Sequence, residues 1–274
     1  MTDKSKKRSL SDFYNIHSGK TIYLIGNGYG LLEIPDNIKN KLKNEITIGV
    51  NSSHLFGTTT YNNSSTWSCY LMNCHFGEVT ECRFYQGRGM GLEENDSSWH
   101  TGGPTTLPET FYDDHNTVNI SHHLRHPFFD SSALFVNPGE SGPIFGADNS
   151  IFSATNLATI MGAKKIVYLG FDGKGNHYYD EPTLMEKYTQ QKDILVETYA
   201  DDPFIQLDLA DMENKNITKK EALDYLTSTY DDNVEKLHRI FYSMQENDVT
   251  PYVSKKDSVV YEAGATFLDW EDYE

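Results

Sequence analysis

The fold of the chain is decided by the stretch Thr21-Ile-Tyr-Leu-Ile-Gly-Asn-Gly-Tyr-Gly30, in which an apolar run ends in a glycine-rich loop. The β-branched and aromatic residues of the run, bounded by turn residues, predict a buried strand. The loop then lies at the carboxyl end of a strand, where ligands bind in open α/β sheets. Its spacing is G-x-G-x-G and not the dinucleotide fingerprint G-x-G-x-x-G, so a tight turn explains it equally well.

Two further units extend this pattern. A strand at residues 46–50 follows the first after one helix length of chain, residues 31–43, in which Pro35 marks a turn or a helix start. Residues 150–162 carry apolar side chains at intervals of three and four, end in a glycine and lead into a strand at 165–169. A β-α-β order requires parallel strands. The sequence therefore predicts an α/β, Rossmann-like fold with a mostly parallel sheet flanked by helices and a helical lid or insertion.

We expect four parts along the chain. They are a flexible tail (1–18), a Rossmann-like nucleotide-binding core (19–180) with long loops and outer strands at 55–140, a helical lid with a packing helix (181–249), and a last strand with an acidic tail (250–274). The third part contains predicted helices at 182–199 and 219–247, and the last strand covers 250–253.

Composition limits the classes of function. The 274 residues carry a net charge of -17, from 23 basic and 40 acidic side chains, which opposes binding to a long stretch of nucleic acid. The only basic cluster, Lys4–Arg8, lies in the expected tail. No apolar run reaches the roughly 20 residues of a membrane span, and the first ten residues lack the apolar centre of a signal peptide. We expect a globular cytoplasmic protein without a membrane partner.

Cysteine and histidine residues gather in the first half of the chain. The spacings of Cys69, Cys74 and Cys82 match no usual zinc pattern, so we expect reduced cysteines and no metal site. A metal stays open, because the same region holds His54, His75 and His100. The cluster His122-His-Leu-Arg-His126 could also bind a metal or a phosphate, although surface histidines explain it more simply.

Polar side chains follow the first two strands. Asn27 follows the first strand, and Asn51 and Ser52 follow the second. Amide side chains there could serve a ribose, a base edge or a phosphate without adding charge, although Asn51 could simply cap its turn. Asn149 or Ser150 is the expected cap of the next helix, whose amino end attracts anions.

The loop after the strand at 165–169 reads Gly170-Phe-Asp-Gly-Lys-Gly-Asn-His-Tyr-Tyr-Asp180. It brings together a carboxylate, an imidazole and phenols. Asp172 or His177 could act as a general base toward a hydroxyl acceptor, and Asp172 could instead orient a ligand hydroxyl.

In this order, the motifs resemble those of one superfamily. The motifs are Gly26-Asn-Gly28, Gly49-Val-Asn51, Ser150 before an alanine-containing helix, and Gly162-Ala-Lys-Lys-Ile-Val-Tyr-Leu-Gly-Phe-Asp172. The superfamily comprises bacterial sialyltransferases of glycosyltransferase family 42, motility-associated glycosyltransferases, archaeal 6-hydroxymethylpterin diphosphokinases and many tailed-phage proteins. The resemblance covers roughly half of the chain.

The resemblance implies a nucleotide site. In the sialyltransferases, the residues corresponding to Asn27, Asn51 and Ser150 contact the donor nucleotide, and the strand-end aspartate corresponds to Asp172. We expect the nucleotide to be bound by Gly26, Asn27, Gly28, Asn51, Ser52, Asn149, Ser150, Gly170 and Tyr178. The chain departs from the family in having Tyr29-Gly30 where sialyltransferases have Pro-Ser, and in lacking their Gly-His-Ser segment. His177 is the substitute for the catalytic histidine, so both His177 and Asp172 are candidate catalytic residues.

The leading prediction is a glycosyltransferase that moves a sugar from a UDP- or CMP-linked donor to a hydroxyl acceptor. The acceptor could be a hydroxymethylated base in phage-modified DNA, a metabolite or a glycan, with DNA disfavoured by the net charge. A phage-encoded protein would act in the host cytoplasm, and a homo-oligomer stays open. Because no Asp-x-Asp motif follows a strand, we expect that Mg²⁺ is not essential.

Two alternatives remain. The first is an ATP-dependent diphosphokinase acting on a hydroxymethylated small molecule, in which Asp148, Asp172 and Asp180 could hold Mg²⁺. The second is a non-catalytic phage accessory protein that only binds a nucleotide.

Overall fold

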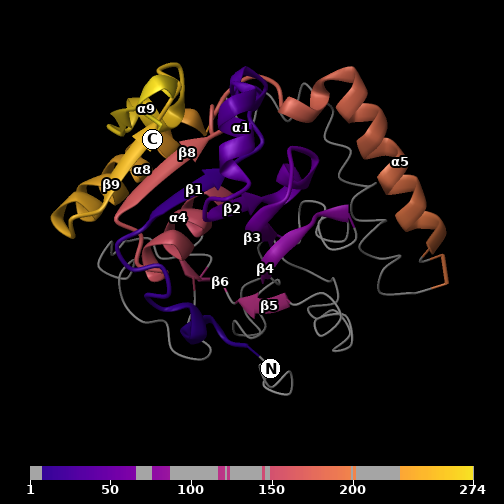
Figure 1. Cartoon of the computed structure of the whole chain (residues 1–274), viewed down its shortest axis with the longest axis horizontal. Helices are drawn as coiled ribbons and strands as arrows, with labels where there is room; N and C mark the ends of the chain where they lie inside the picture. Colours follow the sequence, from indigo (N-terminus) through magenta and orange to yellow (C-terminus); the bar gives the residue numbers. More distant parts are fainter. Residues whose placement is uncertain are drawn as a thin grey trace.

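A computed structural model describes residues 8–65, 76–86, 117–120, 122–123, 144–145, 149–198, 200–201 and 229–273. Within these residues the chain forms an eight-stranded sheet with the order β10-β9-β8-β1-β2-β3-β4-β5 (Figure 1). Every neighbouring pair of strands in this sheet is parallel. The predicted α/β, Rossmann-like fold is confirmed.

The strands of the main sheet are β1 (Thr21–Ile25), β2 (Thr47–Val50), β3 (Thr59–Ser65), β4 (Val79–Gln86), β5 (Thr117–Ile120), β8 (Lys165–Leu169), β9 (Thr250–Val253) and β10 (Thr266–Phe267). A separate parallel pair consists of β6 (His122–His123) and β7 (Ile144–Phe145). The α-helices are α1 (Asp36–Leu42), α4 (Ser150–Ile160), α5 (Pro182–Thr198), α8 (Tyr230–Glu246) and α9 (Val259–Glu262). Short 3₁₀ helices are η1 (Leu10–Phe13), η2 (Tyr29–Glu33), η3 (Asn51–Leu55), η5 (Tyr178–Asp180) and η6 (Trp270–Asp272).

Two hydrophobic cores lie on opposite faces of the sheet, because alternate side chains of a strand point to opposite faces. Ile22 and Leu24 of β1 belong to the core that contains η1, α4, α8 and α9. Tyr23 and Ile25 belong to the core that contains η2 and α1. Both faces of β1 are therefore covered, as expected for a central strand of a parallel sheet.

The order of the strands reverses beside β1. From β1 the chain adds β2, β3, β4 and β5 on one side, and it later adds β8, β9 and β10 on the other. The switch point therefore lies between β1 and β8. In sheets of this kind, ligands bind outside the carboxyl ends of the strands at this point.

The local predictions around this centre are confirmed. The predicted strands at 21–25, 165–169 and 250–253 have the bounds of β1, β8 and β9. The predicted helix at 150–162 is α4, and Gly162 after it adopts a left-handed φ of 85°. The segment 31–43 is helical only in part, because η2 ends before Pro35 and α1 begins after it. Of the helix expected at 219–247, residues 219–228 lie outside the described residues, and α8 covers the rest.

The two ends of the chain differ from the expected tails. Leu10 and Phe13 are three residues apart on η1 and are both buried in a core, so residues 10–13 belong to the fold. At the other end, β10 extends the sheet beyond β9, and Tyr273 stacks on Tyr23 with ring centroids 6.1 Å apart. The expected tails therefore contribute apolar contacts to the core.

The helical segment that we expected to act as a lid is described only in part. Residues 202–228 lie outside the described residues. Helix α5 is joined to the core where His54 Nε2 lies 3.1 Å from Gln191 Oε1. Figure 1 shows α5 and the C-terminal elements β9 and α9 on opposite sides of the molecule. No helix among the described residues is both long and apolar enough to cross a membrane.

Candidate functional site

A chain of hydrogen bonds joins the carboxyl ends of β1 and β2 to the start of α4. Asn27 Nδ2 donates to the carbonyl oxygen of Val50 at 3.1 Å, and Asn51 Nδ2 donates to Ser150 Oγ at 3.1 Å. Since Val50 immediately precedes Asn51, these bonds place Asn27, Asn51 and Ser150 in one strand-end cluster. All three are predicted site residues.

Two features of the strand-end cluster destabilise the fold, namely a strained backbone at Asn51 and an unsatisfied oxygen of Asn27. Asn51 has a φ of 49°, a left-handed conformation that costs non-glycine residues about 1 kcal/mol, although asparagine tolerates it better than most. Asn27 Oδ1 is buried without a hydrogen-bond partner among the described residues. A buried acceptor that is left unsatisfied costs about 1–3 kcal/mol. A donor group that reached this oxygen would remove that cost.

Helix α4 starts at the cluster. Asn149 is its cap, because the Asn149 side chain accepts a hydrogen bond from the backbone N–H of Ile151 at 3.1 Å. Ser150, the first residue of the helix, is the partner of Asn51. The positive end of the helix dipole therefore lies beside Asn51, in a position that favours an anion.

Buried amides of β3 extend the cluster, and the sequence analysis missed them. Asn62 Nδ2 lies 3.4 Å from the carbonyl oxygen of Asn51, and Asn63 Nδ2 donates to Ser153 Oγ of α4 at 2.8 Å. Both asparagines are almost fully buried. The available signal was two consecutive asparagines inside a strand, where this residue type is depleted.

The loops after β1 and β8 lie against each other over the switch point. Gly28 N donates to the carbonyl oxygen of Gly170 at 2.7 Å, and Tyr178 N donates to that of Asn27 at 2.9 Å. Tyr29 N donates to the carbonyl oxygen of Asn176 at 3.2 Å. The predicted residues Gly26, Gly28 and Gly170 thus contribute backbone that joins these two loops.

The spacing of the glycines follows from the close approach of Asp172. A Cβ atom on Gly28 would lie 2.6 Å from Asp172 Oδ2, and one on Gly30 would lie 2.8 Å from Asp172 Oδ1. A Cβ on Gly26 would overlap the carbonyl oxygen of Gly170. The pattern G-x-G-x-G is therefore a set of positions where only hydrogen fits beside the β8 loop.

The two carboxylate oxygens of Asp172 differ, because Oδ2 is bonded and Oδ1 has no hydrogen-bond partner among the described residues. The Asp172 side chain is buried, with the residue 4% exposed, and its Oδ2 accepts a hydrogen bond from Gly30 N at 2.7 Å and lies 3.9 Å from Lys255 Nζ. Burial raises the pKa of Asp172 above its ordinary value, while the Gly30 hydrogen bond and Lys255 act in the opposite direction. A raised pKa makes the carboxylate a stronger base.

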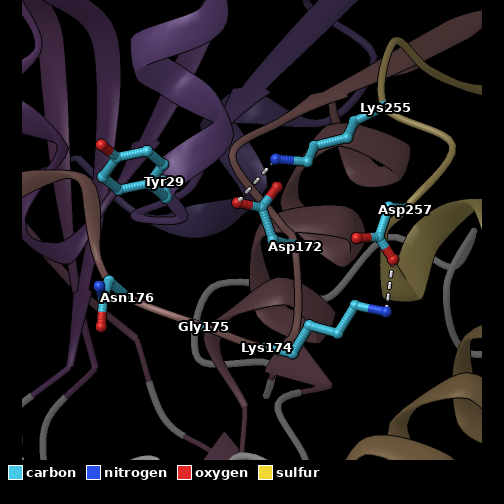
Figure 2. A pocket seen from close by; sticks show the side chains of 7 residues that line it. All are labelled: Tyr29, Asp172, Lys174, Gly175, Asn176, Lys255 and Asp257. Carbon is cyan, nitrogen blue, oxygen red and sulfur yellow. Dashed lines mark ion pairs between the residues drawn. The ribbon is translucent and has the colours of Figure 1, made fainter.

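A cavity of about 480 Å³ opens at Asp172. It is lined by Tyr29, Asp172, Lys174, Gly175, Asn176, Lys255 and Asp257 (Figure 2). Of the predicted site residues, only Asp172 lines this cavity. The sequence analysis missed Lys255 and Asp257, although both follow β9 and could have been found by the same rule of strand ends.

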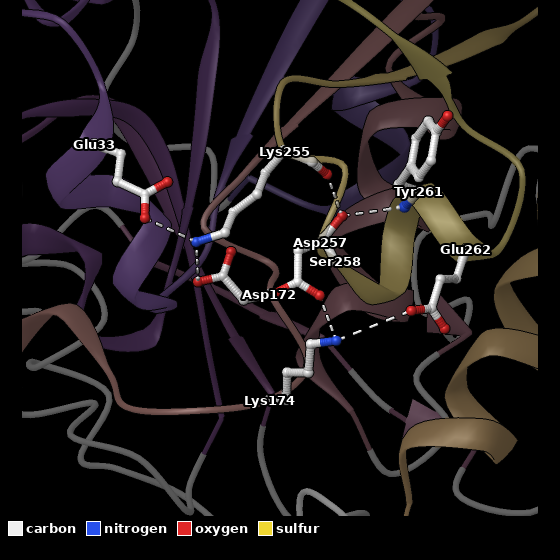
Figure 3. A network of polar contacts seen from close by, with 8 residues as sticks. All are labelled: Glu33, Asp172, Lys174, Lys255, Asp257, Ser258, Tyr261 and Glu262. Carbon is white, nitrogen blue, oxygen red and sulfur yellow. Dashed lines mark hydrogen bonds and ion pairs between the residues drawn. The ribbon is translucent and has the colours of Figure 1, made fainter.

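Every lysine at the cavity is already paired with carboxylates. Lys255 Nζ lies 3.1 Å from Glu33 Oε1, besides its contact with Asp172. Lys174 Nζ lies 2.5 Å from Asp257 Oδ1 and 4.0 Å from Glu262 Oε1 (Figure 3). Through Asp172 and Lys174 these ion pairs join the β8 loop to residues that follow β9, and through Glu33 they join η2 to Lys255.

Three other predicted residues hold the loops together. The Tyr178 hydroxyl is fully buried and donates to the carbonyl oxygen of Ser52 at 2.6 Å. The backbone N–H of His177 donates to Asp180 Oδ2 at 3.0 Å, and the backbone N–H of Asp180 donates to the carbonyl oxygen of His177 at 3.1 Å. His177 thus caps η5 and does not line the cavity.

Those histidine and cysteine residues that the structure describes do not come together in one place. Cys82 is buried in the core, where burial raises the pKa of its thiol to about 12, and His54 contacts Gln191. Within the described part of the chain, no group of three or more histidine, cysteine, aspartate or glutamate residues could hold a metal ion. The side chains of His122 and His123 and the residues Cys69, Cys74, His75, His100, His126 and Asp148 lie outside the description.

The fold and the site define a doubly wound α/β protein with polar groups at the carboxyl ends of its central strands. No protein-family model matches the chain, and the search of curated proteins finds no match.

Proposed function

We propose that the chain is a glycosyltransferase that transfers a sugar from a UDP- or CMP-linked donor to a hydroxyl acceptor. The observation that carries this proposal is the strand-end cluster, in which Asn27, Asn51 and Ser150 form one set of hydrogen bonds. The motifs of these residues also carry the resemblance to the sialyltransferase superfamily.

The cluster suits the nucleotide part of the donor. Asn27 Oδ1 can accept a hydrogen bond from a ribose hydroxyl or a base amino group, which would remove the cost of its burial. The amino end of α4, beside Asn51, favours the phosphate. No side chain in the cluster is charged, so recognition depends on hydrogen bonds and on the helix dipole.

Asp172 is the proposed general base. Its Oδ1 lacks a described partner, and the residue lines the cavity, whereas His177 does not line it. Asp172 would take the proton of the acceptor hydroxyl as the hydroxyl oxygen attacks the anomeric carbon. The bond from that carbon to the donor phosphate breaks, and the nucleotide leaves with the bonding electrons.

Titration calorimetry with a panel of nucleotide sugars tests the donor site. We expect a UDP- or CMP-linked sugar to bind, and Asn51→Gly to weaken its binding about tenfold, the loss of roughly one good hydrogen bond. Glycine keeps the left-handed backbone of Asn51 without its amide. Asn15→Gly is the matched control, since Asn15 also has a positive φ, of 59°, and lies before β1, at the other end of that strand. The proposal fails if no donor binds, or if both variants bind equally well.

The two alternatives make different predictions. A diphosphokinase requires Mg²⁺ and consumes ATP. One of its candidate carboxylates, Asp180, already accepts a hydrogen bond from the His177 backbone, and Asp172 keeps only Oδ1 without a described partner. A non-catalytic protein would bind the nucleotide without turnover of any acceptor. An assay of ATP consumption with Mg²⁺, run beside the sugar-transfer assay, separates the three functions.

A further inference from the structure

The cavity at Asp172 is a separate place from the strand-end cluster. Its lining comes from the loops after β1, β8 and β9, and it contains none of Asn27, Asn51 and Ser150. A volume of about 480 Å³ is within the range of small-molecule sites. The cavity therefore has room for a second ligand beside a nucleotide.

Tyr29 gives the cavity an exposed aromatic ring. Its backbone N–H donates to the carbonyl oxygen of Asn176, which anchors the backbone at this position. The residue is nevertheless 45% exposed, so its ring is accessible to a ligand. In Figure 2, Tyr29 and Asn176 lie on one side of Asp172, and Lys174 and Asp257 lie on the other. An aromatic face buries the C–H face of a sugar ring and excludes water from it.

The cavity also offers hydrogen-bonding groups for hydroxyls. Asp172 Oδ1 is an acceptor without a described partner, and the Asn176 side chain has no hydrogen bond within the described part of the chain. A carboxylate oxygen accepts a hydrogen bond from a hydroxyl group, and an amide side chain can both donate and accept. The hydroxyl groups of a sugar ring that stacks against Tyr29 can donate to such an acceptor and can bond to such an amide.

The charges at the cavity select against an anion. Lys255 is paired with Glu33 and Asp172, and Lys174 is paired with Asp257 and Glu262 (Figure 3). An anionic ligand would therefore compete with these carboxylates for the two lysines, and it would also be repelled by the carboxylates. A neutral ligand meets neither penalty.

We propose that this cavity binds a neutral sugar ring, which stacks on Tyr29 and places a hydroxyl group at Asp172 Oδ1. This assignment of an acceptor rests on the proposed glycosyltransferase function, and it names the acceptor class as a neutral glycoside. A phosphorylated metabolite or a nucleic acid does not fit the same site.

Titration of the ¹⁵N-labelled full chain, followed by NMR, tests the proposal without a donor. The probes are the methyl glycosides of glucose, galactose and N-acetylglucosamine, with methyl glucuronide and glucose 6-phosphate as anionic counterparts. We expect at least one neutral glycoside to shift the amide signals of residues 28–30 and 172–176, and the anions to bind more weakly.

Variants at Tyr29 test the role of the ring. We expect Tyr29→Ala to weaken glycoside binding by about fivefold to tenfold, and Tyr29→Phe to retain it, because stacking needs the ring and not the hydroxyl. Tyr242→Ala is the matched control, since Tyr242 is an exposed tyrosine of α8 that does not line the cavity. Thermal unfolding of each variant shows whether it is folded.

Three results overturn the proposal. They are the absence of binding by every neutral glycoside, equal or stronger binding of the anions, and unchanged binding in Tyr29→Ala. None of these results depends on the nucleotide titration with Asn51→Gly. If glycosides bind but no nucleotide sugar does, the glycosyltransferase function is contradicted. If a nucleotide sugar binds but no neutral glycoside does, only the acceptor class is contradicted.

Discussion

The strand-end cluster and the cavity at Asp172 lie over the same edge of the sheet but use different chemistry. In the cluster, neutral amides and a hydroxyl bond to one another and to the backbone. At the cavity, carboxylates and lysines from loops far apart in the sequence form ion pairs around an open space. The proposed function divides the roles in the same way, with nucleotide recognition assigned to the cluster and proton transfer to the cavity.

The largest expected effect is on catalysis at the cavity. If Asp172 is the general base, Asp172→Asn should lower the rate of sugar transfer by about 10²–10⁴-fold while the affinity for the nucleotide stays the same. Steady-state rates and donor titrations measure the two effects separately. Asp36→Asn, at an exposed ion pair in α1, is the control. A rate within a few-fold of the native rate would remove Asp172 from this role.

The next effect is on the contact between the two loops. Gly28→Ala should destabilise the fold by about 1–3 kcal/mol, because the new Cβ would press on Asp172 and on the carbonyl of Gly170. Urea unfolding measures this change. Gly57→Ala is the matched control, since a Cβ there meets no atom within 4 Å and should change stability by less than about 0.5 kcal/mol. Equal stabilities of the two variants would show that the loops are not closely packed.

A smaller effect concerns the pH dependence of stability. The folded-state pKa of Asp172 is raised, so the folded protein binds this proton more tightly than the unfolded chain does. The contribution of Asp172 to stability is therefore largest below its unfolded pKa and falls as the pH rises through its folded pKa. Urea unfolding from pH 3.5 to pH 7 measures this contribution: the stability of the native protein minus that of Asp172→Asn should fall as the pH rises. Parallel profiles would contradict the burial of a charged carboxylate.

The smallest expected effect is at Lys255, which is a positioning residue. Because Lys255 lowers the pKa of Asp172, Lys255→Met should raise that pKa. Transfer needs the deprotonated base, so the rising limb of the rate profile should move to higher pH. Lys164→Met removes the ion pair with Asp248, beyond the amino end of β8, and should leave the profile unchanged. An unchanged pH–rate profile in Lys255→Met would show that Lys255 does not influence the pKa of Asp172.

The sequence predicted the strands and the cluster better than the cavity. The runs at 21–25 and 165–169 have strong local signals, and the rule that ligand groups follow parallel strands identified Asn27 and Asn51. The cavity forms because β9 pairs with β8, which brings the loops after the two strands together. This pairing is a property of the strand order, which no local sequence pattern predicts. The two-residue strand β10 likewise has no local signature and is defined by its pairing with β9.

Single residues show the same limit. Tyr178 lies in a loop rich in polar residues and glycine, yet its ring is fully buried and its hydroxyl bonds to Ser52, a contact across 126 residues of sequence. Tyr29, in contrast, stood out only as a departure from the motif of the family that the sequence resembles. Its exposure beside Asp172 is a property of the folded loops.

The central claim is that the cluster and the cavity bind different ligands. Crystal structures of the chain with UDP and with CMP test it most directly. We predict that one of these nucleotides lies within hydrogen-bond distance of Asn51 and Ser150 and leaves the cavity between Tyr29 and Asp172 empty. A nucleotide stacked on Tyr29 inside the cavity, or bound away from both places, would contradict the claim.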